Sequence, residues 1–231
     1  LAPTRELGQQ IFTNLESYAK YMPNMSIATV CGGIPIKPQI ERLQSPTHIV
    51  VATPGRLADL VKRNAIDISK IAYFILDEAD EMLSMGFKED LNRILSYNKS
   101  KRNTWLFSAT MPEEIKRIVK TYMSDNAIRV EINKNALVNE NISHLFINTK
   151  IKDKINLIIK ILNTRKEERG IVFCRTKAGT RTLAKQLQDK GFAAGALEGD
   201  MQQKERDKVM RAFRNESLRI LVSTDVSARG I

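Results

Sequence analysis

Residues 74 to 83 read FILDEADEML, so an apolar run of strand length ends directly in three carboxylates, Asp77, Glu78 and Asp80. Because 26 of the 231 residues are acidic, such a pattern arises by chance about 0.3 times per chain, and its context must decide its meaning. Carboxylates crowded at a strand end repel one another unless a cation or hydrogen-bond donors satisfy them. Mg²⁺ suits this place, because it takes one or two carboxylates, keeps several waters and leaves the rest to phosphate oxygens. The alternative is a solvated acidic helix start, which the helix dipole favours.

This run belongs to a series of apolar segments of strand length, which alternate with helical patterns along the chain. In the first half, strands are expected at 26–30, 48–52, 71–76 and 104–107, and helices around 7–18 and 115–122. In the second half, strands are expected at 145–149, 170–174, 193–197 and 219–223, and helices at 152–165, 178–190 and 203–214. The alternation predicts an α/β fold in which a mainly parallel sheet is flanked by helices.

An Asn-rich stretch of low periodicity, residues 132 to 142, separates the two series and is typical of a linker. We therefore expect a first domain at 1–132, a linker at 133–142 and a second domain at 143–231.

The composition favours a polyanionic partner, because 37 Lys and Arg against 26 Asp and Glu give a net charge of +11 and a pI near 9.7. A basic, solvated surface without a partner is the alternative. The longest apolar stretches fall far short of the roughly 18 residues that span a membrane, and no signal-peptide pattern opens the chain, so we expect a cytoplasmic protein. The cysteines and histidines are isolated, which argues against disulfides and a structural zinc site.

Distinctive polar residues follow the predicted strands, and ligands bind beyond the carboxyl ends of the strands in an open parallel sheet. These segments are PTRE (3–6), GG (32–33), TPGR (53–56), DEAD (77–80), SAT (108–110), CRTKAG (174–179), EGDMQQKER (198–206) and STDVSARG (223–230). Structural roles are the alternative for several of them. Thr110 with Glu113 forms a capping-box pattern, Thr53 before Pro54 is a good helix N-cap, and the glycine pair suits a tight turn.

In order and roughly in spacing, these segments resemble the motif series of the DEAD-box ATP-dependent RNA helicases over the full length of the chain. The resemblance implies two RecA-like domains that close around ATP and single-stranded RNA. It implies that Asp77 holds Mg²⁺ through water and that Glu78 orients and activates the water that attacks the γ-phosphate. It also implies that Asp80 bonds to the hydroxyl groups of Ser108 and Thr110, which links nucleotide state to domain closure.

The resemblance assigns contacts with the RNA backbone to strand-end residues in both domains. These are Pro3, Thr4, Arg5, Gly33, Thr53, Gly55 and Arg56 in the first domain, and Arg175, Gln203, Arg206 and Thr224 in the second. Hydroxyl groups, guanidinium groups and backbone amides suit phosphate oxygens and do not read bases, so sequence-independent RNA binding is expected. Arg229 and Gly230 are assigned to the seam that faces the nucleotide.

The chain also departs from the family pattern. It contains no G-x-x-x-x-G-K-[ST] string and no adenine-reading Q motif, and it ends before the Asp expected after Arg229–Gly230. We therefore expect an internal fragment with two incomplete domains, inactive by itself. For the parent protein we expect ATP hydrolysis coupled to local unwinding of RNA duplexes or remodelling of RNA–protein complexes. The alternative is an ATP-gated clamp that binds RNA.

Overall fold

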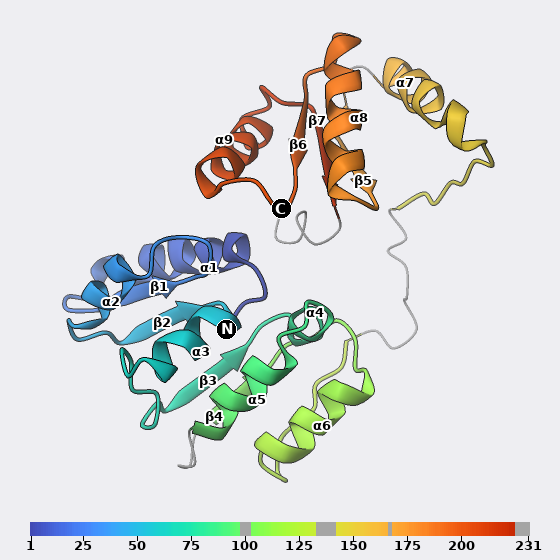
Figure 1. Ribbon diagram of the computed structural model, residues 1–231. Coiled ribbons are helices and arrows are strands. Elements are labelled where there is room, and N and C mark those ends of the chain that lie inside the picture. The colour runs from blue at the N-terminus through green and yellow to red at the C-terminus, as the bar shows by residue number, and fades with distance from the viewer. Residues whose placement is uncertain (98–102, 133–141, 166–167, 225–231) are drawn as a thin grey trace. The chain divides into compact units, whose positions relative to one another are not determined.

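The computed structural model describes residues 1–97, 103–132, 142–165 and 168–224 (Figure 1). These residues divide into two compact units, of which the first contains Leu1–Asp125 and the second contains Asn126–Asp200. The second unit also includes most of the helix and the strand that follow Asp200. The linker expected at 133–142 lies outside the described residues, apart from Ile142.

The first unit contains two separate two-stranded parallel sheets. β1 (Ile27–Val30) pairs with β2 (Ile49–Ala52), and β3 (Tyr73–Leu76) pairs with β4 (Asn103–Leu106). The backbone of the first two residues joins the ends of β2 and β3. The Ala2 amide donates to the Ala52 carbonyl at 3.0 Å, and the Asp77 amide donates to the Leu1 carbonyl at 3.0 Å. The segment that follows, PTRE, therefore starts between the carboxyl ends of β2 and β3.

The helices of the first unit pack around these four strands. They are α1 (Arg5–Tyr18), the 3₁₀ turn η1 (Ala19–Tyr21), α2 (Lys37–Leu43), α3 (Pro54–Lys62), α4 (Ala79–Ser84), α5 (Lys88–Tyr97) and α6 (Glu113–Tyr122). α1 packs on β1 and β2, whereas α3 packs against α5. Apolar residues of α2 to α6 and of the strands enclose one core, in which Leu60, Leu76, Met82, Leu91 and Ile94 are fully buried. Strand β3 alternates between exposed and buried residues, so its even-numbered side chains, Phe74 and Leu76, belong to this core.

The second unit has a parallel sheet in the order β5-β7-β6, formed by β5 (Gly170–Cys174), β6 (Ala194–Leu197) and β7 (Ile220–Thr224). The 3₁₀ turn η2 (Ile151–Asp153) and the helices α7 (Lys154–Thr164), α8 (Lys177–Asp189) and α9 (Gln203–Arg214) complete it.

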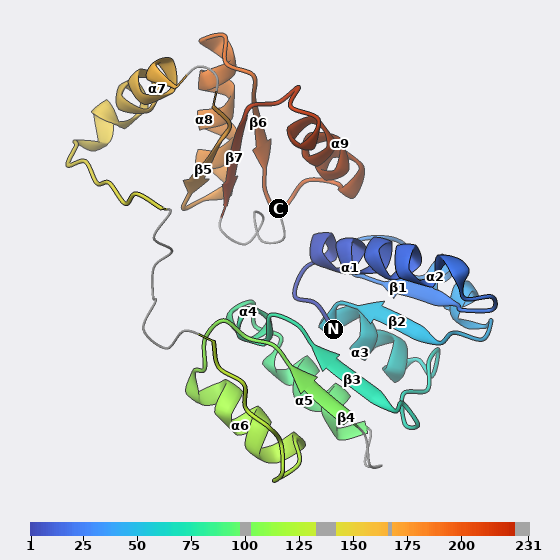
Figure 2. The same cartoon turned by 180° about the vertical axis from the view of Figure 1, so that it is seen from behind.

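Both faces of this second sheet are covered, because successive side chains of a strand point to opposite faces. Ile220 and Val222 of β7 pack in a cluster with α8, whereas Leu221 packs with Met210 and Phe213 of α9. The two helices accordingly lie on opposite sides of the sheet (Figure 2).

The predicted α/β fold with parallel sheets is therefore confirmed, and the strands and helices of the second half lie within two residues of their predicted bounds, with one exception. The strand predicted at 145–149 is wrong. Residues 142–150 have no regular secondary structure, and Leu145 and Phe146 are 85% and 91% exposed. A β-favouring composition describes how well a segment fits a pleated, half-buried surface, and this segment pairs with no described strand.

We predict that Leu91→Ala lowers the free energy of unfolding of the first unit by about 2–5 kcal/mol, because it removes a fully buried side chain and leaves a cavity. Met22→Ala is the matched control, because it also shortens an apolar side chain in the first unit but at a 53% exposed position, and it should stay within about 0.5 kcal/mol of wild type. Urea denaturation followed by the fluorescence of Trp105, the single tryptophan, measures both. Equal losses in the two variants would contradict this core.

Candidate functional site

The acidic segment lies in the turn between β3 and α4, and the end of β4 holds this turn in place. The Phe107 amide donates to the Leu76 carbonyl at 2.8 Å, and the Ala79 amide donates to the Phe107 carbonyl at 3.0 Å. Between these two anchors, Glu78 is the N-cap residue of α4 and adopts the left-handed conformation, with φ 50° and ψ 52°. Such a conformation costs a non-glycine residue on the order of 1–3 kcal/mol, and residues of this kind cluster at functional sites.

Asp80 is the best-connected carboxylate of the segment. Its Oδ2 accepts hydrogen bonds from the Thr110 hydroxyl group at 2.6 Å and from the Thr110 amide at 2.9 Å. The Ser108 hydroxyl group accepts from the Asp80 amide at 3.3 Å and donates to the Thr110 carbonyl at 2.7 Å. Partial burial by itself raises the pKa of Asp80, but the hydrogen bonds from Thr110, Ser108 and the Glu81 amide outweigh it and lower the pKa. The structure thus brings Asp80, Ser108 and Thr110 together.

This geometry corrects two of the capping alternatives. Thr110 does not cap α6, whose N-cap is Pro112, because its hydroxyl group binds Asp80 instead. Thr53 occupies the N-cap position of α3 without a capping hydrogen bond, and its Oγ1 accepts from the Gly32 amide at 3.2 Å. In both places the side chain joins two strand ends rather than closing its own helix. Thr4 does cap its helix, since its Oγ1 accepts from the Leu7 amide at 3.3 Å.

The glycine-bearing turn after β1 lies against the PTRE segment. Gly33 has φ +74°, and a Cβ atom at this position would lie 2.6 Å from Nη2 of Arg5. The backbone conformation favours glycine here, and the guanidinium group of Arg5 lies against the turn. The structure thus brings together Gly33, from the turn after β1, and Arg5, from the start of the chain.

Arg56 reaches the same turn from the first turn of α3. Its Nη2 donates to the Ile34 carbonyl at 2.9 Å, whereas its Nη1 is buried and has no hydrogen-bond partner among the described residues. A guanidinium group carries five N–H donors, and a buried donor without a partner costs free energy. Gly55 lies beside it at the start of α3, and Pro3 is buried next to Thr4. Among these residues, Arg56 presents a donor without a partner at the start of α3.

The second unit carries its predicted residues at the carboxyl edge of its own sheet. Arg175 is exposed directly after β5, and Thr224 ends β7. Gln203 begins α9, and the buried Arg206 lies in the first turn of that helix, where its Nη1 donates to the Glu198 carbonyl at 3.2 Å. Arg229 and Gly230, the residues assigned to the nucleotide-facing seam, lie outside the described residues.

A group of charged residues at this second edge was missed by sequence reasoning. Lys177 and Arg181 of α8 pair with Glu198 and Asp200, which follow β6. The i, i+4 spacing of the two cations places them on one helix face. Their acidic partners lie 17 to 23 residues further along the chain, and no local pattern links them.

Asp77 suits a metal ion that is held through water molecules, rather than a site in which several side chains bind the ion directly. No group of three or more metal-binding side chains occurs among the described residues. The Asp77 amide donates to the Leu1 carbonyl, whereas the Asp77 carboxylate accepts no hydrogen bond among the described residues. One carboxylate with several waters and phosphate oxygens is an ordinary Mg²⁺ environment, so the donor set fits this ion.

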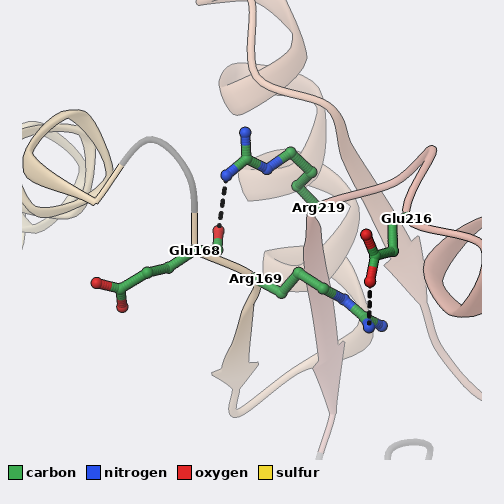
Figure 3. A pocket seen from close by; sticks show the side chains of 4 residues that line it. All are labelled: Glu168, Arg169, Glu216 and Arg219. Carbon is green, nitrogen blue, oxygen red and sulfur yellow. Dashed lines mark hydrogen bonds and ion pairs between the residues drawn. The ribbon is translucent and has the colours of Figure 1, made fainter.

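A pocket lined by Glu168, Arg169, Glu216 and Arg219 lies at the opposite edge of the second sheet, where β5 and β7 begin (Figure 3). Nη1 of Arg169 lies 3.6 Å from the Glu216 carboxylate, and Nη2 of Arg219 donates to the Glu168 carbonyl at 3.4 Å (Figure 3). Its cations are therefore paired within the pocket, and it is separate from the residues that the sequence singles out.

Comparison with known proteins identifies the family of this chain. The family model described as DEAD/DEAH box helicase matches residues 1–118. The chain belongs to this family. A second model, the helicase conserved C-terminal domain, matches residues 153–231. The resemblance seen in the sequence is thus confirmed, and the two units are the RecA-like domains of a DEAD-box helicase.

Several relatives of this DEAD-box chain are known. It is 43% identical to a probable ATP-dependent RNA helicase of Methanocaldococcus jannaschii, and all of the chain aligns with 61% of that protein. It is 38% identical to eukaryotic initiation factor 4A of Caenorhabditis elegans, where it covers 57%, and 42% identical to the helicase CshA of Streptococcus pneumoniae, where it covers 44%. The chain therefore spans about half the length of these relatives.

Solved structures give the same result for the fold. The structure of Saccharomyces cerevisiae Dbp5 bound to RNA and ADP BeF₃ matches with a TM-score of 0.87 at 29% identity, over all of this chain and 58% of Dbp5. A DEAD box protein from Methanococcus jannaschii matches with a TM-score of 0.53 at 43% identity, over 61% of that chain. In the part of the helicase chain that the structure describes, no helix is long and apolar enough to cross a membrane.

We predict that Thr110→Val lowers the free energy of unfolding at pH 7 by about 1 kcal/mol, because it removes a hydrogen bond to an ionised carboxylate that is partly exposed. The pKa of Asp80 is lowered in the folded state, so this stabilisation is present above the ordinary pKa of an aspartate and is lost as the pH falls through the lowered value. The difference between variant and wild type should therefore shrink from pH 7 to about pH 3.

Urea denaturation at the two pH values measures this effect. Thr121→Val, at an exposed position of α6, is the matched control and should cost little at either pH. A cost for Thr110→Val that is independent of pH would show that the carboxylate is not the partner of the hydroxyl group.

Proposed function

We propose that the protein to which this chain belongs is an ATP-dependent RNA helicase, which couples ATP hydrolysis to local RNA unwinding or to remodelling of RNA–protein complexes. The turn that carries Asp77, Glu78 and Asp80 supports this proposal most strongly, because the end of β4 anchors it and Thr110 holds it through Asp80. Relatives named as ATP-dependent RNA helicases and the likeness to Dbp5 bound to RNA and ADP BeF₃ agree with it. We infer a cytoplasmic location, where both ATP and RNA occur.

The catalytic roles follow from the position of each carboxylate in the turn. Asp77, at the end of β3, would hold Mg²⁺ through its waters. When bound, the ion neutralises charge on the phosphate oxygens. Glu78 follows directly, and its left-handed backbone gives its side chain a different direction from that of a residue in the helix. It would orient the attacking water and accept its proton, as a general base does. Phosphoryl transfer depends mainly on such positioning and charge stabilisation.

Asp80 would couple the nucleotide to the rest of the domain. The Asp80 carboxylate would take no part in hydrolysis itself, because its Oδ2 already accepts two hydrogen bonds from Thr110. Any movement of the Asp77–Glu78 turn would therefore pull on the segment after β4, and the reverse also holds. We propose this bond as the link between ATP hydrolysis and the work done on RNA.

RNA would bind to the donors that follow the carboxyl ends of the strands in the two units. In the first unit, Arg5, Arg56 and the turn at Gly33 lie together, and the unpartnered Nη1 of Arg56 is a donor for a phosphate oxygen. In the second unit, Arg175 and Arg206 have the same chemistry. Contacts with phosphate position a nucleic acid without reading its bases, so the proposed binding is independent of sequence.

We predict that Glu78→Gln in the full-length protein lowers RNA-stimulated ATP hydrolysis by at least about 100-fold, because a general base is lost. Binding of ATP and RNA should persist, since Gln keeps the size and polarity of the side chain. Glu81→Gln in the same short helix is the matched control, and it should keep turnover within a few-fold of wild type. Phosphate release measures both variants. Turnover near that of wild type in Glu78→Gln would show that Glu78 is not the general base.

We also predict that Arg56→Gln weakens binding of single-stranded RNA about equally for all sequences. Each phosphate contact contributes about −0.7 to the slope of log K against log salt for a single strand, so the slope should become shallower by about this amount. Arg63→Gln, at the other end of α3 and paired with Asp59, makes the same charge change in an exposed position. Fluorescence anisotropy with oligouridylate and oligoadenylate at several salt concentrations tests this. Loss of binding to one base alone would contradict a backbone contact.

A further inference from the structure

The turn after β6 contains a buried carboxylate with donors on both of its oxygens. Glu198 follows β6 directly, and its side chain is 4% exposed. Its Oε1 accepts from Nε of Arg181 at 3.0 Å, and its Oε2 accepts from the Asp200 amide at 2.6 Å. A buried carboxylate is tolerated only when it is paired and hydrogen-bonded in this way. The carboxylate therefore fixes the shape of the turn from Glu198 to Asp200.

The same turn is fastened to α8 by a second carboxylate. Asp200 binds Nζ of Lys177 and accepts from Nη2 of Arg181 at 3.0 Å. The hydrogen bond from Lys177 is the main cause that lowers the pKa of Asp200. Arg181 thus donates to both carboxylates. Of the two, the Glu198 side chain is buried, whereas the Asp200 side chain is exposed.

The backbone of Glu198 acts on a different residue. Its carbonyl accepts from Nη1 of Arg206 at 3.2 Å, and Arg206 is 8% exposed. The position of this carbonyl depends on the shape of the turn from Glu198 to Asp200. The Glu198 carboxylate fixes that shape through its two hydrogen bonds. The geometry points to a positioning pair: we propose that Glu198 and Arg181 set the guanidinium group of Arg206 in the orientation in which it binds an RNA phosphate. This inference rests on the proposed RNA binding by Arg206.

The effect of a substitution follows from the donors that surround the carboxylate. In Glu198→Gln an NH₂ group replaces one of the two accepting oxygens, so a donor then faces either Arg181 or the Asp200 amide. The turn is then held on one side only, and Arg206 loses a fixed acceptor. We expect RNA affinity about 3- to 10-fold weaker, and a slope of log K against log salt that is shallower by about 0.7, the value of one phosphate contact on a single strand.

The experiment is a double-substitution cycle measured by binding of a fluorescent oligouridylate to the full chain over a range of salt. Arg206→Gln alone removes the proposed contact and should make the slope shallower by about 0.7. If Glu198 acts through Arg206, the combination Glu198→Gln/Arg206→Gln has the slope and affinity of Arg206→Gln alone. A further, additive loss in the combination would overturn the inference.

The matched control is Glu168→Gln, which makes the same charge change in the same unit and breaks the exposed 2.7 Å pair between Arg165 and Glu168. It should leave affinity and slope unchanged. An identical effect of Glu168→Gln and Glu198→Gln would assign the effect to net charge and overturn the inference. If wild type itself binds no RNA, the proposed function fails, and that result is separate from failure of the cycle.

Arg181→Gln removes the partner of the same carboxylate. The Arg181 side chain is 56% exposed, so this substitution provides a second variant should Glu198→Gln not fold. Its cycle with Arg206→Gln should show the same absence of additivity. Thermal denaturation of every variant accompanies the binding measurements. A loss of affinity that follows the melting temperature, with the salt slope of wild type, would indicate a structural role alone and overturn the inference.

Discussion

The parallel pairing of the described strands is the constraint on which the site depends. Parallel strands in one sheet all end at the same edge, so the segments that follow them meet although they are far apart in the sequence. In the first unit, the backbone at Leu1 and Ala2 joins the ends of β2 and β3, and the start of α4 is held by the end of β4. The helix starts and turns that carry polar side chains are thereby brought close together.

Hydrogen bonds between strand ends then give this edge its internal order. Thr53 holds Gly32, and Thr110 holds Asp80, so each threonine side chain links two strand ends. The left-handed conformation of Glu78 persists between anchored neighbours, as strained residues do when the surrounding structure over-determines them. The second unit uses an ion pair between the buried Glu198 and the exposed Arg181 in a similar place, where the carboxylate fixes a turn. In both units rigidity is supplied next to the residues proposed to bind the ligand.

Charge alone gives a poor map of where a polyanion binds. The chain carries a formal charge of +11, yet Lys177 and Arg181 are neutralised by acidic partners, and so is Arg169 in the pocket at the far edge of its sheet. Arg56, by contrast, keeps a buried donor that the described residues leave without a partner. Arg56 is therefore a stronger candidate for the proposed phosphate contact than these paired cations.

The sequence by itself determined the α/β class, most strand positions and the family, because hydrophobic periodicity and the order of short motifs are local properties of the chain. It misplaced a strand at 145–149, since a strand also needs a neighbour with which to pair. It gave Thr53 and Thr110 local capping roles as alternatives, whereas the tertiary structure turned both hydroxyl groups toward other strand ends. Only the fold decided that Glu198 is buried against Arg181, because such a pair depends on the packing of α8 beside β6, and no spacing in the sequence encodes that distance.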